Sequence, residues 1–153
     1  MKFLDHAWIA SRIPHKGSMC LLDRVTDWNE TRIVCKANSH RSPDNPLRQE
    51  GRLGITTGVE YAAQAMAVHG VLLADNDKSH ATGYLTSVRN VHWNRNRLDE
   101  LDGEIEVHAE RLSGNEISIL YSFRVFFGEE VLIEGKASIM LNATGSSKKE
   151  KTS

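Results

Sequence analysis

Residues Gly58–Ala74 carry the one long helical pattern in this chain of 153 residues. Val59, Ala62 and Met66 recur there at the spacing of one helix face, and most of the residues between them are small or apolar. A helix that is nearly apolar all round is buried inside a protein rather than laid on its surface. The rest of the chain is therefore expected to surround this helix.

Strand patterns fill most of the remaining sequence, two before the helix and four after it. They cover residues 21–28, 31–37, 84–93, 103–112, 117–127 and 131–141. Short turns between the last three predict an antiparallel meander. Because one helix cannot cover both faces of about six strands, the expected fold class is α+β, a curved antiparallel sheet wrapped round one long central helix. Such a sheet leaves an edge and an apolar flank, which favours dimerisation.

The segments outside this pattern are interpreted as follows. Residues 1–20 are predicted to be an irregular lead-in, and residues 144–153 a disordered polar tail, which leaves one domain over residues 1–143. Residues 38–54 form a long loop with two of the three prolines. Long ordered loops in compact domains are usually functional, so this loop is a candidate site.

Composition excludes several function classes. The formal net charge of -1 gives no general affinity for nucleic acid or anionic lipid. No run reaches the roughly 18 apolar residues of a membrane span, and charge follows the first residues too closely for a secretory leader. Cys20 and Cys35 form neither a disulfide framework nor a metal-ligand spacing. The expected location is the cytoplasm, with no metal site.

Three stretches resemble a known family, in the right order along residues 12–142. Ile13–His15 with Leu21–Val25 resembles the motif LPHR…LLVDRV, and Gly58–Ala65 resembles the helix phrase G-V-…-E-A-L-A-Q. Gly83–Val91 resembles the strand phrase GFLAGID-NVRF. The motifs are those of the hotdog 3-hydroxyacyl-acyl-carrier-protein dehydratases of fatty-acid and polyketide synthesis. The resemblance therefore implies a hotdog fold.

The chain departs from that family just before the helix. Family enzymes carry GHFPGRP-MPG there, and its histidine is catalytic. Residues 46–57 of this chain read PLRQEGRLGITT, which contains no histidine and is a few residues shorter. In this respect the chain looks more like the dehydratase-like proteins of aryl-polyene pigment clusters.

The resemblance implies dehydration of 3-hydroxyacyl thioesters carried on the phosphopantetheine of acyl carrier protein, with no other cofactor. It also implies a dimer, because dehydratase sites of this family form between two hotdog chains. A homodimer and a mixed dimer with a second hotdog protein both fit. Two alternatives stay open, namely a non-catalytic or half-site subunit and an acyl thioesterase, because fold alone does not decide the reaction.

Two residues are candidates for acid–base catalysis. Glu60 lies at the start of the helix, where partial burial would raise its pKa and the helix dipole would favour its anion. The sequence Thr57–Glu60 also spells a capping box, in which Glu60 only bonds a backbone amide. His40 in the long loop is the second candidate, with a solvent-exposed loop histidine as the alternative. His69 is expected to be a buried, hydrogen-bonded histidine.

Five further residues are candidates for substrate binding. The backbone amides of three glycines before the helix suit a thioester oxyanion. Gln64, one turn beyond Glu60, could orient that carboxyl or lie in an interface. Arg48, with Arg52 nearby, could meet a phosphopantetheine phosphate or an acidic carrier, or be a solvated surface residue. The three glycines are Gly51, Gly54 and Gly58.

Overall fold

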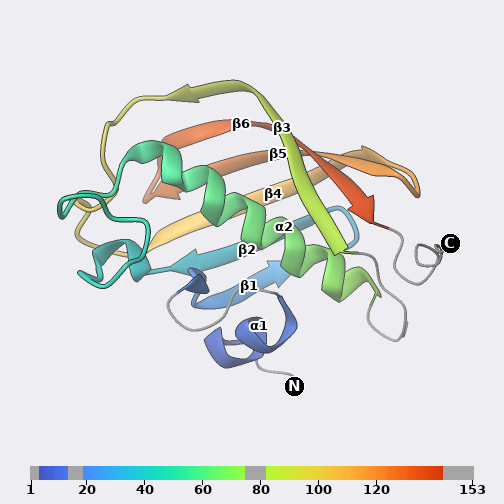
Figure 1. Cartoon of the computed structure of the whole chain (residues 1–153), viewed down its shortest axis with the longest axis horizontal. Coiled ribbons are helices and arrows are strands. Elements are labelled where there is room, and N and C mark those ends of the chain that lie inside the picture. The colour runs from blue at the N-terminus through green and yellow to red at the C-terminus, as the bar shows by residue number, and fades with distance from the viewer. Residues whose placement is uncertain (1–3, 14–18, 75–81, 143–153) are drawn as a thin grey trace, which may run out of the picture.

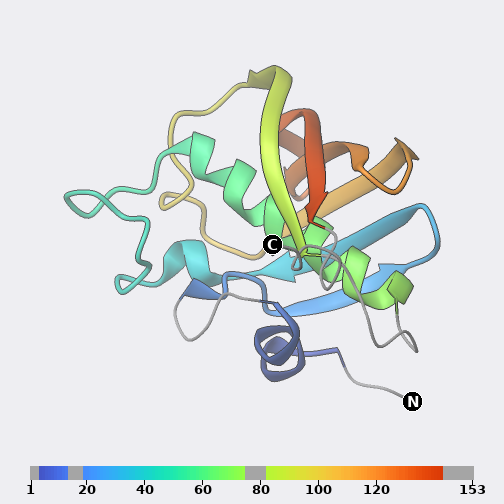
Figure 2. The same cartoon turned by 45° about the vertical axis from the view of Figure 1, so that its right-hand side comes forward.

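Helix α2 spans Gly58–Ala74, the residues that the helical pattern predicts, in this computed structural model. The structure describes residues 4–13, 19–74 and 82–142. A six-stranded antiparallel sheet, ordered β1-β2-β4-β5-β6-β3, curls round α2 (Figures 1 and 2). This is the predicted hotdog arrangement.

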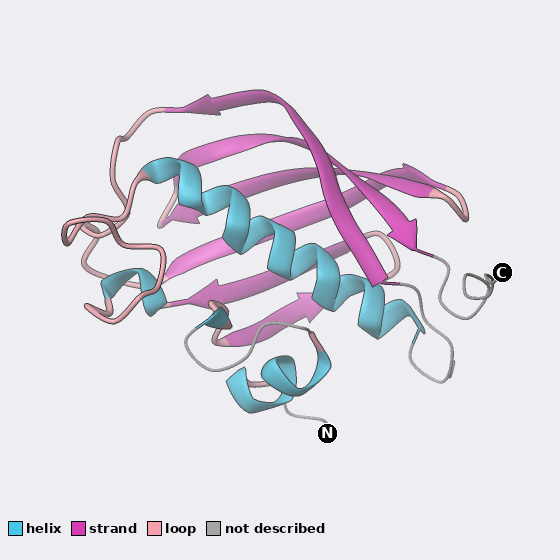
Figure 3. Cartoon of the chain, in the orientation of Figure 1, coloured by secondary structure: helices cyan, strands magenta, loops and turns pink. Residues whose placement is uncertain are grey.

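The strand predictions are confirmed to within two residues, except at the start of the first strand. Figure 3 shows the strands as one curved layer that bends round the long helix. The last three form the predicted meander, and β3 pairs with β6 at one edge of the sheet. The strands are β1 (Arg24–Trp28), β2 (Arg32–Ala37), β3 (Thr82–Trp93), β4 (Ile105–Gly114), β5 (Ser118–Phe127) and β6 (Glu130–Asn142).

The core lies between α2 and the inner face of the sheet. Tyr61, Ala65 and Val68 of α2 are fully buried against alternate residues of β2, β4 and β5. The helix begins very close to the sheet, because a Cβ at Gly58 would lie 2.8 Å from Ile133 Cγ2. Only a residue without a side chain fits this approach unless Ile133 moves.

The lead-in contains a helix that the sequence patterns did not reveal. Helix α1 spans His6–Arg12, and the Asp5 carboxylate caps it by accepting the Trp8 amide hydrogen at 2.9 Å. The prediction of an irregular segment over residues 1–20 was therefore wrong for these seven residues. The amide of Val25 donates to Leu4 O at 2.9 Å, so the start of the chain covers part of the β1 edge.

The remaining predictions concern the two cysteines, the segments outside the helix and strands, and the absence of a membrane span. Cys20 and Cys35 are free and buried, and burial raises the pKa of Cys35 to about 12. The predicted disordered tail, and the Pro14-His15 part of the opening motif, lie outside the described residues. None of the helices described has the length and hydropathy that crossing a membrane requires.

Candidate functional site

Glu60 projects from the first turn of α2 and is exposed. Among the residues that the structure describes, none forms a hydrogen bond or ion pair with its carboxylate. The capping box is absent, because the Thr57 hydroxyl donates to Gly54 O at 2.6 Å instead of capping the helix. The alternative interpretation of Glu60 as a cap is therefore wrong, and its carboxylate is available to another molecule.

The side of α2 that carries Glu60 is only partly covered by its own chain. Ala63 and Ala67 are half-buried and Gly70 is exposed, at the three- and four-residue spacing of one helix face. The sequence predicted that the helix is buried nearly all round, and the structure confirms this for the opposite face but not for the face with Glu60. A carboxylate at the end of an open, small-residue helix face can be enclosed by a second protein chain.

The edge strand β3 offers a second open surface. It pairs only with β6, so the backbone groups on its other side have no strand partner in the described sheet. Tyr84 is 53 % exposed and Trp93 is 51 % exposed along this strand. A long edge with exposed aromatic side chains is a template for pairing with another chain.

His40 lies in a short 3₁₀ turn, Ser39–Arg41, in the long loop, and it is fully buried. The prediction of a solvent-exposed loop histidine is therefore wrong. Neither ring nitrogen makes a hydrogen bond of good geometry, although the backbone of Leu101 and that of Gly103 lie close enough to favour the protonated ring. Burial outweighs these contacts and lowers the pKa of His40 below its usual value. Its catalytic role stays a prediction, and substrate could reach it only if the loop opened.

The three candidate glycines have different local roles. Gly51 has a left-handed φ of 79° in a tight turn, which favours glycine. Gly54 supplies the carbonyl that binds Thr57. The amide of Gly58 already donates to the carbonyls of Ile55 and Thr56 at the helix start. An oxyanion site here would therefore need amides other than that of Gly58, and oxyanion binding by the three stays a prediction.

Arg48 braces the long loop from inside. Its guanidinium donates to three backbone carbonyls, those of Ser42 at 2.8 Å, Gly51 at 2.6 Å and His40 at 3.0 Å. Arg52 is exposed and forms no ion pair with any described residue. Of the two arginines, Arg52 is the one whose charge is free for a phosphate or an acidic carrier.

Gln64 is buried and does not bond Glu60. Its side-chain oxygen accepts the Leu21 amide hydrogen at 2.8 Å, and its side-chain nitrogen donates to Met19 O at 2.8 Å. Both ends of the amide are therefore used to fasten the segment before β1 to the helix. The hypothesis that Gln64 orients Glu60 directly has no support in these contacts.

A polar network that sequence reasoning missed holds the long loop against α2. The buried Tyr61 hydroxyl bonds Ser39 Oγ at 2.8 Å and Asn45 Nδ2 at 3.2 Å. Ser39 Oγ also donates to Leu21 O at 2.7 Å. The sequence carries a weak signal for it, a tyrosine directly after the candidate carboxylate in an otherwise apolar helix. Because Tyr61 is next to Glu60, the network ties the loop to the helix turn that carries the candidate acid.

The described histidines do not complete an acid–base pair with Glu60. His6 bonds Leu22 O, His69 bonds two other groups, and His92 and His108 stand on the sheet. His15 and His80 lie outside the described residues. The described part of the chain thus presents one available carboxylate at a helix start, without the base or acid that a dehydration also requires.

Comparisons with known proteins point to one family and to a wider fold class. Residues 7–148 match the family described as ApeP-like, ApeP dehydratase. The dehydratase heterocomplex ApeI:P from Xenorhabdus doucetiae contains a chain that superimposes with a TM-score of 0.78 at 20 % identity, covering 89 % of this chain and 91 % of that one. No curated protein matches the sequence.

Thioesterases share the fold at lower similarity. Thioesterase HI1161 from Haemophilus influenzae superimposes with a TM-score of 0.58 at 11 % identity, covering 78 % of each chain. A hypothetical thioesterase from Streptococcus pneumoniae, solved with coenzyme A, gives a TM-score of 0.58 at 7 % identity, covering 78 % of this chain and 85 % of that one. At these identities the likeness concerns the hotdog fold alone.

Proposed function

Because this chain belongs to the ApeP-like dehydratase family, we propose that it is one subunit of a two-chain hotdog dehydratase acting on 3-hydroxyacyl thioesters of acyl carrier protein. The observation that carries the proposal is the exposed, unpaired carboxylate of Glu60 at the start of α2. The described residues of the same chain place no histidine on it. A second chain would supply the missing group.

The reaction converts the 3-hydroxyacyl thioester into the 2-enoyl thioester and water. A base takes the proton alpha to the thioester carbonyl, the C–O bond to the 3-hydroxyl breaks, and an acid protonates the departing oxygen. Glu60 is proposed as one of these two groups. Backbone amides at the start of α2 would stabilise the negative charge that develops on the carbonyl oxygen.

The proposed partner is a second hotdog dehydratase chain. The related structure is named as a heterocomplex of ApeI and ApeP, and the open β3 edge with Tyr84 and Trp93 is a surface on which strand pairing could occur. A homodimer would pair through the same edge. It would bring together two copies of Glu60 and would add no different catalytic group. The mixed dimer is therefore the favoured assembly.

Acyl carrier protein is proposed as the substrate carrier. Arg52 is exposed and free of acidic partners among the described residues, which suits contact with an acidic carrier or its phosphopantetheine phosphate. Arg48 would act indirectly, by holding the long loop in its conformation. Hydrolysis of the thioester, with Glu60 activating water, is the second candidate function, because thioesterases share this fold.

The test is incubation of 3-hydroxyacyl-carrier-protein with the purified chain, alone and together with a co-expressed hotdog partner, followed by intact mass of the carrier. Loss of one water with the partner present supports the proposal, and loss of the whole acyl group means a thioesterase. Glu60→Gln should reduce dehydration by about 10²–10⁴-fold. Glu129→Gln, an exposed turn carboxylate, is the matched control. No change in the presence of the partner would reject the proposal.

A further inference from the structure

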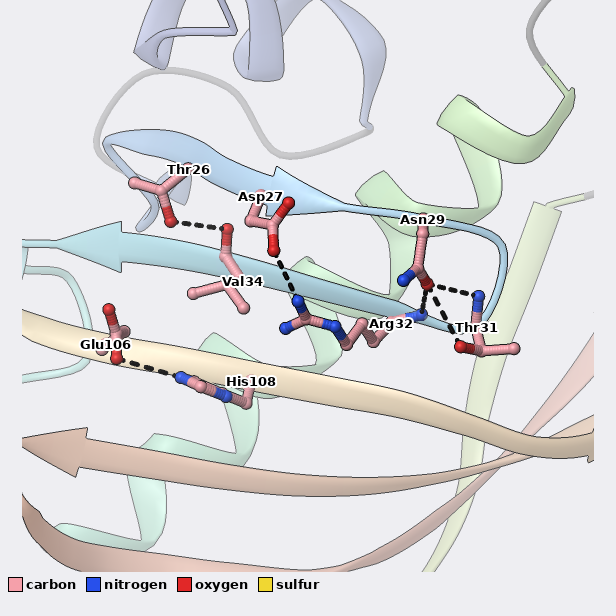
Figure 4. Close-up of polar contacts among 8 residues, drawn as sticks. All are labelled: Thr26, Asp27, Asn29, Thr31, Arg32, Val34, Glu106 and His108. Carbon is pink, nitrogen blue, oxygen red and sulfur yellow. Dashed lines mark hydrogen bonds and ion pairs between the residues drawn. The ribbon is translucent and has the colours of Figure 1, made fainter.

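The outer face of the sheet, opposite α2, contains a hollow of about 350 Å³. Figure 4 shows Arg32 and His108 standing on this face, with the helix behind the sheet. Ser122 of β5 lies near the middle of the hollow, between Glu110 of β4 and Lys136 of β6 in the strand register. A short side chain among long neighbours explains why the surface is hollowed at this point.

Lys136 lines one end of the hollow, and Arg89 lies beside it on the neighbouring strand, just outside the lining residues. Lys136 and Arg89 are directly opposite each other in the register of β6 and β3. Within the described ranges neither forms an ion pair, and both are exposed. Like charges placed directly opposite on neighbouring strands destabilise a sheet. An anion between them would remove this repulsion.

Two acids on this face are engaged with other cations, and Glu110, which lines the hollow, forms no ion pair with any described residue. Glu134 accepts from Arg124 Nε at 2.9 Å, and Asp27 accepts from Arg32 at 2.6 Å. Glu110 is on β4, two strands from Lys136, which corresponds to roughly 9–10 Å between strand axes. That separation is about one Debye length at physiological salt, so its carboxylate offsets the Lys136 charge only in part.

Neutral hydrogen-bond donors lie beside the two cations. The Ser122 hydroxyl is on the strand next to Lys136. Asn90 lines the hollow and has a left-handed φ of 55°, within the irregularity that separates Arg89 from His92 in the β3–β6 pairing. A β-bulge with a strained non-glycine residue at its centre commonly re-aims side chains toward a site. Hydroxyl, amide and cationic groups together are the usual ligands of phosphate oxygens.

We propose that this outer-face hollow binds a phosphate group, held mainly by Lys136 and Arg89 with Ser122 and Asn90 as hydrogen-bond donors. The ligand class is a phosphate monoester or diester. The hollow and Glu60 are on opposite sides of the sheet, so the site is separate from the proposed catalytic one. It belongs to this chain alone and does not depend on the proposed reaction.

The experiment compares phosphate with chloride at equal ionic strength, using thermal unfolding and calorimetric titration with pyrophosphate on the full chain. Phosphate should raise the Tm of the natural protein more than chloride does. Lys136→Gln should raise the Tm in chloride, because it removes the repulsion, and should weaken pyrophosphate binding at least tenfold. Arg89→Gln should behave in the same way.

Arg12→Gln is the control, because it removes one exposed guanidinium of α1 that forms no ion pair with a described residue, and it changes the net charge equally. It should leave pyrophosphate binding within twofold of the natural protein. Equal effects of phosphate and chloride, or equal losses in Arg12→Gln and Lys136→Gln, would overturn the proposal. Titration with adenosine monophosphate and with phosphopantetheine then separates a nucleotide from a carrier arm as the source of the phosphate.

Discussion

Among the described residues, two histidines are fully buried, and their situations are opposite. His69, near the C-terminal end of α2, uses both ring nitrogens, with Nδ1 2.7 Å from the Tyr121 hydroxyl and Nε2 2.8 Å from Asn29 O. Because a carbonyl only accepts, Nε2 carries the hydrogen and Nδ1 accepts from Tyr121. His40, in the long loop, makes no hydrogen bond of good geometry at either nitrogen, and only the backbone of Leu101 and Gly103 approaches the ring.

The difference separates a structural histidine from one that the fold alone does not explain. His69 joins α2, β5 and the β1–β2 turn, so both of its ring nitrogens form hydrogen bonds that hold the fold together. A buried polar group without partners costs free energy of folding, and such groups in native structures call for a functional or conformational reason. The loop that carries His40 also flanks the helix start with Glu60, which keeps the loop in the candidate site.

The largest expected effect is that of His69→Ala. Removing the ring leaves a cavity and deprives Tyr121 and Asn29 of their partners, so we expect the free energy of unfolding to fall by about 3–5 kcal/mol. Urea denaturation followed by circular dichroism measures it. His92→Ala, which truncates an exposed histidine, should change stability by no more than about 0.5 kcal/mol. A similar loss in both variants would mean that His69 has no special role.

A smaller effect is expected for Tyr121→Phe, which removes one hydroxyl and keeps the ring. His69 Nδ1 then has no donor, and the free energy of unfolding should fall by about 1–2 kcal/mol. A double-mutant cycle with His69→Ala measures the coupling between the two side chains. Strict additivity would show that the 2.7 Å contact contributes nothing to stability.

The opposite sign is expected for His40→Leu. The substitution replaces two buried nitrogens that lack a well-formed hydrogen bond with an apolar side chain of similar size, so we expect the protein to become more stable by about 1 kcal/mol. Denaturation with urea gives the sign, and a clear loss of stability would contradict the absence of partners. The same variant tests catalysis, because a fall in dehydration of 100-fold or more would support the predicted catalytic role and unchanged turnover would reject it.

The smallest expected effect is the change in stability with pH, to which both buried histidines contribute. Burial lowers the pKa of both His40 and His69 below their usual 6.5. The unfolded chain therefore binds protons that the folded chain does not, so stability is greatest above pH 6.5 and falls as the pH drops below it. Tm measured from pH 7.5 to pH 5 should decrease, and His40→Leu should flatten the curve. A curve that rises on acidification would contradict the lowered pKa values.

Local patterns explain which elements could be predicted. The 17 residues of α2 agree with the prediction at both ends, because four to five turns give a clear helical period. The seven residues of α1 are too few for such a period, and only Asp5 marks its start. Strand β1 begins late, at Arg24, because Leu21 offers its amide to Gln64 on the helix rather than to a neighbouring strand.

The candidate site likewise combines features that the sequence predicted with features that only the structure shows. The position of Glu60 at the helix start follows from the sequence, and the resemblance to dehydratases draws attention to it. Its exposure and its lack of partners could not be predicted from the sequence. The competing capping box is an equally good local pattern, and only the structure shows that the Thr57 hydroxyl bonds Gly54 O instead. The brace made by Arg48 involves three carbonyls of the same loop, whose conformation no short motif specifies.

By itself the sequence determined one long helix and six strands, because hydrophobic period depends only on neighbours along the chain. The family was indicated separately, by the resemblance of three motifs to those of the dehydratases. The tertiary structure alone decided which polar groups are used and which are free. Gln64 meets Leu21 across 43 residues, and His69 meets Tyr121 across 52. Such partners come together only after the sheet has closed round α2, and so the availability of Glu60 and the isolation of His40 are properties of the folded chain.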